Sequence, residues 1–288
     1  MERMKANSWK PCAELAPYIE RYWSWESSSN CALPILLPGT GNDLFIHFQR
    51  PFSNINHPAH LLCVRTRPWP LESNGPTAFI AIRFRMGALR HFCGFGLGEL
   101  FDQSVTVEQL WGQEGQRWAE NVVLKSRSTF CRGVIEESLI RWLRRYCRPD
   151  DAIDWVAARL YYDHPNCRVD DLASGFRMGR RQIERRFKSA LGVPPKAFHR
   201  LARFQHVVRD LLLTQSRDGL DTALAHGYYD QAHFIREFES FAQVTPTSFL
   251  NQRNFMSHFY NPPQGLSAIP ASTFPWNADK TRNTGEKS

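Results

Sequence analysis

The sequence has no long uninterrupted apolar segment. Its first 25 residues contain Lys5, Lys10, Glu14, Glu20 and Arg21 among scattered apolar residues, which excludes the apolar core of a secretory signal peptide. No stretch approaches the roughly 18 consecutive apolar residues that a helix needs to cross a bilayer. We therefore expect a cytoplasmic protein that has no membrane partner.

The sequence also lacks the patterns of disulfide-rich and metal-binding proteins. Its seven cysteines are odd in number and include no CxxC pair, so we expect neither a disulfide framework nor a structural zinc site. His47, His57, His60 and His91 include no HxH pair followed by a suitably placed Glu and His, and we expect them to be structural or exposed. The segment PGTGND lacks the Lys-Ser/Thr ending of a P-loop. We expect no metal, no cofactor and no catalytic residue.

The length and the charge set two further limits. A chain of 288 residues is long enough for two domains, each with its own core. A net charge of +8 and a pI near 9.3 favour a polyanionic partner such as nucleic acid or an anionic membrane surface. Basic proteins without such a partner are common, so the charge alone does not identify DNA.

The first half of the chain has the pattern of a mainly β domain. Short apolar runs at Leu33–Leu37, Asp43–Phe48, His60–Val64 and Ala78–Phe84 are separated by clusters of Gly, Pro, Asn and Asp, which predicts strands and turns. From Val107 onward apolar residues recur at helical spacing, which predicts two closing helices. We place the domain boundaries at 1–149 and 150–254. The polar segment 255–288 is predicted to be a disordered tail.

Residues 169–250 contain an internal repeat. Six residues recur at a constant offset of 51 positions, and this agreement in one register indicates a duplicated unit. Upstream, the offset between Ala173 and Ala223 is 50, so one residue is inserted at the turn. The recurring pairs are Ile183 and Phe234, Arg185 and Arg236, Phe187 and Phe238, Val193 and Val244, Pro195 and Pro246, and Phe198 and Phe249.

Each unit has the pattern of a helix-turn-helix. In the first unit we expect a short helix over Val169–Phe176 and a second helix that begins near Arg180. Ile183 and Phe187 lie four residues apart on one face of the second helix and are expected to pack inward. The opposite face is then a basic ridge of a size that enters the major groove. A long helix over Pro195–Leu213 is expected to join the units.

Two stretches carry a family resemblance. DDLASGFRMGRRQIERRFKSALGVPPKAFHRLARFQ and ALAHGYYDQAHFIREFESFAQVTPTSF closely resemble the AraC/XylS-type DNA-binding domain over about 85 residues, and GYYDQAHFIREF and VTP are specific features of that family. The resemblance implies recognition helices that enter successive major-groove segments roughly 34 Å apart. It further implies a transcription regulator that binds double-stranded DNA and recruits or blocks RNA polymerase.

The resemblance also assigns site residues by motif position. The residues expected to contact bases are Arg180, Arg181, Glu184 and Arg185 in the first unit and Gln231, Ala232, Ile235 and Arg236 in the second. Arginine can pair with guanine, glutamate with cytosine and glutamine with adenine, while Ala and Ile can touch a thymine methyl group. Arg186, Lys188 and Lys196 are expected to contact phosphates, which sets affinity without selecting a sequence.

Several alternatives stay open at this point. Arg185 and Arg236 recur in both units, so either could instead hold the units together through carboxylates such as Glu184 or Glu237. His233 could cap a helix, face DNA or pack.

Three residues depart from the family pattern. Gly179 stands where a capping Ser is usual, Gln243 replaces the glycine that Gly192 represents in the first unit, and Tyr229 stands where a small capping residue is common. The geometry of the second unit is therefore less firmly predicted.

Charge separates the two units. The segment 168–210 contains eleven Lys and Arg against four Asp and Glu, a net charge of +7, whereas 217–253 has a net charge of −2. We expect the first unit to supply most of the electrostatic attraction to DNA, and the second to add register or to contact another protein.

The first domain has a resemblance of its own. LPILLPGTGNDLFIHF and AIRFRMGALRHFCGF resemble the N-terminal domain of one group of AraC-type regulators, which implies a domain that senses a small-molecule effector or forms a homodimer. A cupin-like half barrel is one arrangement for its strands, and a cupin-like enzyme tethered to a DNA-binding module is the competing hypothesis. Arg83 and Arg85 lie on one strand face, where an anionic effector or, more simply, solvent would meet them.

These patterns predict an α+β fold. Its N-terminal domain is mainly β with closing helices, and its C-terminal domain is all-α, with two helix-turn-helix units joined by a long helix.

Overall fold

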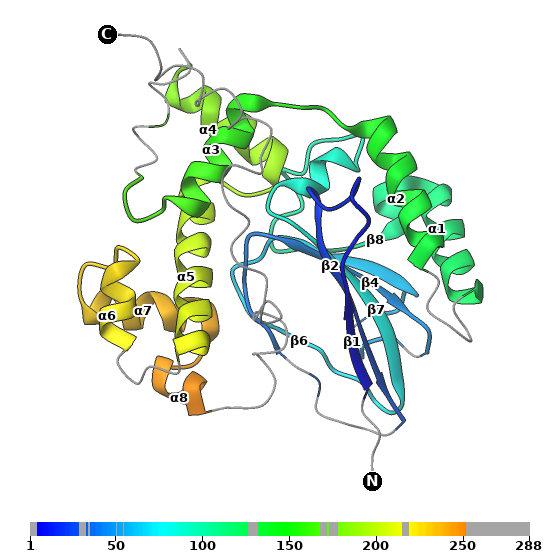
Figure 1. Ribbon diagram of the computed structural model, residues 1–288, viewed down its shortest axis with the longest axis horizontal. Coiled ribbons are helices and arrows are strands. Elements are labelled where there is room, and N and C mark those ends of the chain that lie inside the picture. The colour runs from blue at the N-terminus through cyan, green and yellow to red at the C-terminus, as the bar shows by residue number, and fades with distance from the viewer. Residues whose placement is uncertain are drawn as a thin grey trace, which may run out of the picture.

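Figure 1 shows a computed structural model of the chain, in which an antiparallel sheet and its covering helices pack beside a second group of helices. The predicted α+β fold is confirmed. The tail predicted over 255–288 lies outside the described residues, as does all but Leu172 of the helix predicted over Val169–Phe176. The structure describes residues 5–28, 33, 35–49, 51–53, 55–125, 132–167, 172, 178–214 and 219–251.

Two antiparallel sheets make up most of the first half of the chain. The larger sheet consists of β1 (Lys5–Trp9), β2 (Ile19–Ser27), β4 (Asn42–His47), β5 (Ala59–Leu62), β7 (Thr77–Phe84) and β8 (Ser104–Thr106), and the smaller of β3 (Ile35–Leu36) and β6 (Trp69–Pro70). The order in the larger sheet is β1-β2-β7-β4-β5-β8. Strand β7 therefore lies between β2 and β4, although these strands are far from it in the sequence.

Strand β7 is buried along its whole length because both faces of the sheet are covered. On one face, Phe79 and Ala81 belong to an aromatic core with Trp23 and Phe45. On the other face, Ile80 belongs to the core beneath the helices. This burial on both faces explains why β7 is a continuous apolar run and not an alternating one.

The two closing helices are α1 (Val107–Lys125) and α2 (Arg132–Tyr146), which lie together beside the sheet (Figure 1). Trp111 and Trp142 stack with their ring centroids 4.0 Å apart. Trp118 meets Trp142 edge-on at 5.1 Å. These large apolar rings bind the helices to each other and give the first half a core of its own.

The second half is helical throughout its described part. Its helices are α3 (Asp151–Tyr162), α4 (Arg180–Leu191), α5 (Pro195–Thr214), α6 (Gly219–Ala225), α7 (Gln231–Ala242) and α8 (Pro246–Asn251). The predicted long connecting helix is α5, and α4 and α7 are the second helices of the two predicted units. Helix α3 begins after Asp150, whose carboxylate accepts a hydrogen bond from the backbone N–H of Ile153 at 3.2 Å.

The repeat in the sequence corresponds to a repeat in packing. Phe187 on α4 meets Phe198 edge-on with ring centroids 5.3 Å apart. At the positions 51 residues later, Phe238 on α7 meets Phe249 at 5.5 Å. All four rings are at most 2% exposed. The same residue pairs therefore fix α4 and α7 each against the helix that follows it.

The two halves of the chain are in direct contact. The backbone N–H of Leu97 donates to the carbonyl of Ser189 on α4 at 2.7 Å. The side chain of Gln205 on α5 accepts a hydrogen bond from the Thr40 hydroxyl at 3.1 Å. These bonds connect both α4 and the long helix α5 to the first half.

Candidate nucleic-acid interface and interdomain cavity

Helix α4 presents the expected basic face. Ile183 and Phe187 are 3% and 0% exposed, so the helix is turned with its apolar side inward. Arg181 and Arg185 are exposed on the other side. Arg180 is exposed too, and its Nε lies 2.9 Å from Oε1 of Glu184, which is half-exposed. All four residues expected to contact bases from this unit are therefore accessible.

Helix α7 has the same orientation. Phe234 and Phe238 are buried, while Gln231, Ala232 and Arg236 are exposed. Ile235 is half-buried, because it also packs against the core of the helical half. Only part of the Ile235 side chain is therefore available to touch a base.

The three expected phosphate contacts differ in their surroundings. Lys188 and Lys196 are exposed. Arg186 instead donates to Oδ2 of Asp150 at 2.7 Å and approaches the sulfur of Met178 at 2.9 Å. Its ion pair ties α4 to the start of α3, so Arg186 has a structural partner that competes with phosphate.

A buried carboxylate, whose partners the sequence did not decide, connects α7 to α5. Glu237 on α7 is 5% exposed and accepts hydrogen bonds from Arg200 at 2.7 Å and from Arg203 at 2.6 Å, both on α5. Burial alone would raise the pKa of Glu237, but the two guanidinium groups outweigh burial and lower it. Among the described residues, Arg185 and Arg236 make no ion pair. The ion pairs that Glu237 forms between α5 and α7 use Arg200 and Arg203 instead.

The ends of α7 resolve two of the departures from the family pattern. Asp230 caps the helix, accepting from the backbone N–H of His233 at 2.6 Å, and Tyr229 beside it is 87% exposed. Gln243 occupies the left-handed region with φ of 60°, as Gly192 does with φ of 80° after α4. A residue with a Cβ thus adopts the backbone conformation that favours glycine.

A chain of histidines joins three helical segments. His164 follows α3, and its Nδ1 lies 3.0 Å from the carbonyl oxygen of Tyr161. The Nε2 of His164 lies 2.9 Å from Nδ1 of His226, which follows α6, and Nε2 of His226 lies 2.8 Å from Asp210 on α5. The ring of His206 stacks on His164 at 4.6 Å. No sequence motif signalled this cluster, because its members are spread over 62 positions.

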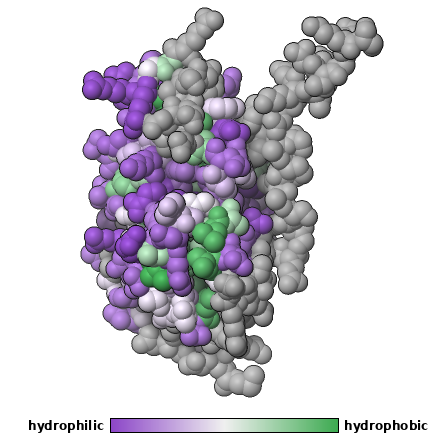
Figure 2. Space-filling view, turned by 90° about the vertical axis from the view of Figure 1, so that its left-hand side faces the viewer, coloured by the Kyte–Doolittle hydropathy of each residue, from purple (hydrophilic) through white to green (hydrophobic). Residues whose placement is uncertain are grey.

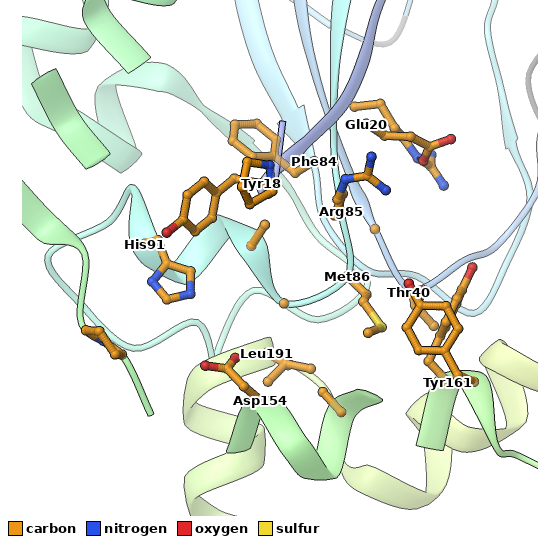
Figure 3. Close-up of a pocket in the computed structure, with 18 of the residues that line it drawn as sticks. Tyr18, Glu20, Thr40, Phe84, Arg85, Met86, His91, Asp154, Tyr161 and Leu191 are labelled. Atoms are coloured by element: carbon orange, nitrogen blue, oxygen red, sulfur yellow. The ribbon is translucent and has the colours of Figure 1, made fainter. Parts of the chain in front are cut away.

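A cavity of about 680 Å³ lies between the two halves (Figure 3). One wall is built from β2, the end of β7 and the short helix η1 (Ala88–His91), and the other from α3, the end of α4 and α5. Met86 lies on the first wall, while Leu191 and Tyr161 lie on the second. The cavity is therefore lined by both halves, on the side of α4 that faces away from the expected DNA contacts.

The polar groups of this cavity are unevenly partnered. Arg90 donates to both carboxylate oxygens of Asp154, at 2.5 and 2.6 Å. Burial, assisted by the charge of Arg90, lowers the pKa of His91 to about 4, so this ring is neutral near pH 7. Arg85 donates its Nε to the backbone carbonyl of Ala16 at 2.9 Å.

Arg83 departs from the expectation of an exposed strand face. It is 7% exposed, and its Nη1 lies 2.5 Å from Oδ2 of Asp43 on the adjacent strand β4. Two features that the sequence does not reveal account for this: the pairing of β7 with β4 supplies the carboxylate, and the docked helical half covers the end of the sheet.

The remaining histidines of the first half form no metal site. His47 and His60 are buried, with His47 Nε2 3.3 Å from His60 Nδ1, and His57 is exposed. Over the described ranges, no group of three or more His, Cys, Asp or Glu side chains is arranged to hold a metal ion.

Among the helices that the structure describes, none is both long and apolar enough to cross a bilayer.

The surface around α3, α5 and α6 is mainly hydrophilic. Figure 2 shows this side of the molecule, which lies at the left of Figure 1, with small separate apolar patches among polar residues.

Comparisons with known proteins separate the two halves. Residues 172–252 match the family model described as helix-turn-helix domain, and residues 7–106 match a domain of unknown function, DUF6597. The HTH-type transcriptional regulator MtrA of Neisseria gonorrhoeae is 34% identical over 82 residues, which are 28% of this chain and 27% of that protein. The chain thus matches about a quarter of the length of this curated relative.

Solved structures of ToxT from Vibrio cholerae are also similar. One, at 1.65 Å resolution, has a TM-score of 0.46 and 14% identity over 86% of this chain and 98% of that chain. Another has a TM-score of 0.42 and 13% identity over 87% and 97%.

The family assignment therefore depends on the repeated helical pair and on the matched segment that contains it. Residues 172–252 of this chain are a helix-turn-helix domain of the AraC type.

Proposed function

We propose that this chain is a cytoplasmic transcription regulator that binds specific duplex DNA through α4 and α7. One observation carries the proposal: Phe187 and Phe238 are buried at equivalent positions, so equivalent faces of two helices are left to solvent. An α-helix fits the width of the major groove, and two such helices on one scaffold can occupy successive turns of one duplex.

The exposed side chains support roles in base recognition. Arg181 and Arg185 on α4 can each pair bidentately with guanine, and Gln231 on α7 can pair with adenine. Each such pair contributes about 1–3 kcal/mol of discrimination against a wrong base. Lys188 and Lys196 are exposed, which supports a role as phosphate contacts that contribute affinity at any sequence.

The first domain is proposed to regulate DNA binding. Its contacts with α4 and α5, through Ser189 and Gln205, give it a physical route to both units. A small-molecule effector, a second copy of the chain and RNA polymerase are the proposed partners.

The proposal is tested first by mapping the genomic sites that the full chain occupies. The anisotropy of a labelled duplex taken from those sites, against a duplex of scrambled sequence, then gives the ratio of specific to non-specific affinity. We expect a ratio of at least about 10³ at physiological salt. The control variant Arg67→Ala removes an exposed arginine of the first domain, and it should leave the ratio of specific to non-specific affinity unchanged. Equal affinity for the two duplexes would contradict the proposal.

A further inference from the structure

The cavity between the two halves has the size and the walls of a ligand site. Its volume of about 680 Å³ lies within the roughly 300–1,000 Å³ that small-molecule pockets occupy. Phe84 and Met86 line it from the first half, and Ala157 and Leu191 from the second. A ligand with an apolar body would thus replace water on both walls at once.

The acidic side chains around the cavity are paired or solvated. Asp154 is held by Arg90, and Oε2 of Glu20 lies 3.8 Å from Nε of Arg83. Asp151 is exposed. These carboxylates therefore do not need a cationic ligand to balance them.

Arg85 is different. Nε of Arg85 donates to the Ala16 carbonyl, and within the described part of the chain Arg85 forms no ion pair with a carboxylate. Neighbouring Arg83, by contrast, is held by Asp43 at 2.5 Å. Figure 3 shows Arg85 on the first wall, above Met86. A guanidinium group has five N–H donors, so most of the donors of Arg85 remain for an anion.

We propose that this cavity binds a small organic anion, with its acidic group on Arg85 and its apolar body between Met86 and Leu191. The inference rests on the proposed function, because it supplies the chemical class of the effector. Since the anion contacts both halves, it binds the docked arrangement better than an undocked one. Binding therefore favours the arrangement in which α4 and α5 are held against the first half.

Two fluorescent probes test the charge requirement directly. 8-Anilino-1-naphthalenesulfonate is an anion, and N-phenyl-1-naphthylamine is the same ring system without the sulfonate. We expect Arg85→Gln to weaken binding of the sulfonate by about tenfold or more, as for loss of a charge-assisted hydrogen bond, and to change binding of the amine less than about twofold. Met86→Trp, which fills the cavity, should abolish binding of both.

Two further variants separate charge from folding. Arg85→Lys keeps the positive charge but cannot reproduce the guanidinium geometry at Ala16, and it should restore most of the sulfonate affinity. Arg67→Gln removes an exposed arginine elsewhere and should leave both affinities unchanged. Thermal unfolding of each variant identifies any general loss of structure.

The outcomes distinguish this inference from the proposed function. Equal loss of both probes in Arg85→Gln, or no binding of the sulfonate to the unaltered chain, overturns the anion site even if the chain binds specific DNA. Charge-dependent probe binding in a chain that does not distinguish specific from scrambled duplexes supports the anion site and overturns the proposed function instead.

Discussion

His226 and Asp210 lie 2.8 Å apart, His226 directly after α6 and Asp210 on α5. A row of hydrogen bonds runs from the Asp210 carboxylate through His226 and His164 to the backbone carbonyl of Tyr161. The groups at its two ends, the carboxylate and the carbonyl, are hydrogen-bond acceptors. The two imidazole rings connect these acceptors through three close contacts. Burial lowers the pKa of His164 to about 4, so this ring is neutral near pH 7.

We expect Asp210→Asn to destabilise the chain by about 1–2 kcal/mol, because it replaces a charged hydrogen-bond partner of His226 by a neutral one. Chemical unfolding at pH 7 measures the loss. Asp221→Asn, which changes an exposed acid on the neighbouring helix α6, is the matched control and should change stability little. Equal effects of the two substitutions would show that the hydrogen-bonded chain contributes nothing.

The stability of the protein should fall below pH 6.5. Burial lowers the pKa of His206 to about 3, whereas the unfolded side chain titrates near 6.5. Between these values the unfolded state binds more protons than the folded state, so the contribution of His206 is complete above pH 6.5 and is lost as the pH falls toward 3. His164 adds a loss over the range from 6.5 to about 4.

The variant His206→Phe isolates this effect, since Phe keeps a ring for stacking but has no proton to gain. At pH 5 we expect it to be more stable relative to the unaltered chain, by about 1–2 kcal/mol, than at pH 7.5. Urea unfolding at both pH values gives the comparison. An unchanged difference between the two pH values would mean that His206 does not contribute to the acid sensitivity.

Arg181→Ala should reduce DNA affinity much more than Arg236→Ala. Both side chains are exposed, but Arg181 belongs to a segment with a net charge of +7, and Arg236 to one with a net charge of −2. Loss of a bidentate contact corresponds to about 1–3 kcal/mol, or five- to 150-fold. Fluorescence anisotropy over a salt series measures both variants, and equal losses would contradict the unequal division of electrostatic attraction.

Glu237→Gln should cost about 3–5 kcal/mol, as is typical when one partner of a buried ion pair is removed. The neutral side chain leaves Arg200 and Arg203 facing each other without a carboxylate between them. Glu239→Gln, a nearby change on α7, is the control. Denaturant unfolding provides the values, and a loss below about 1 kcal/mol would mean that solvent replaces the carboxylate.

Gln243→Gly should stabilise the chain by about 1 kcal/mol, because glycine adopts the left-handed conformation without the steric cost that a Cβ incurs. Gln243→Ala keeps the Cβ and should give no gain. A shift in thermal midpoint measures both variants. Equal behaviour of the Gly and Ala variants would show that the backbone at this position is not strained.

The repeat made the second half of the fold predictable. Ile183 and Phe187 recur as Phe234 and Phe238, and a period of four residues places each pair on one helix face, so the inward side of both helices followed from local sequence. Once the inward side of each helix was known, the residues on its opposite side were predicted to face solvent. Their contacts with DNA stay predictions.

The first half was less accessible to the same approach. The apolar run 78–84 predicted β7, but β2 (Ile19–Ser27) was missed, because glutamate, arginine and serine interrupt its aromatic residues. Its formation depends on pairing with β7, whose partner residues are at least 50 positions away, with a register shift between Ile19 and Arg21. The cavity was missed for a related reason: its walls come from segments that meet only after both halves have folded.

Tyr161 belongs to two of these features. Its side chain lines the cavity, and its carbonyl oxygen is the acceptor for His164. Thermodynamic reciprocity then applies: if an occupant of the cavity alters the affinity of the second helix-turn-helix unit for its operator, the operator must alter the affinity for the occupant by the same factor. Ligand released on addition of operator DNA, or taken up more tightly, would report the sign of the coupling between the cavity and operator binding.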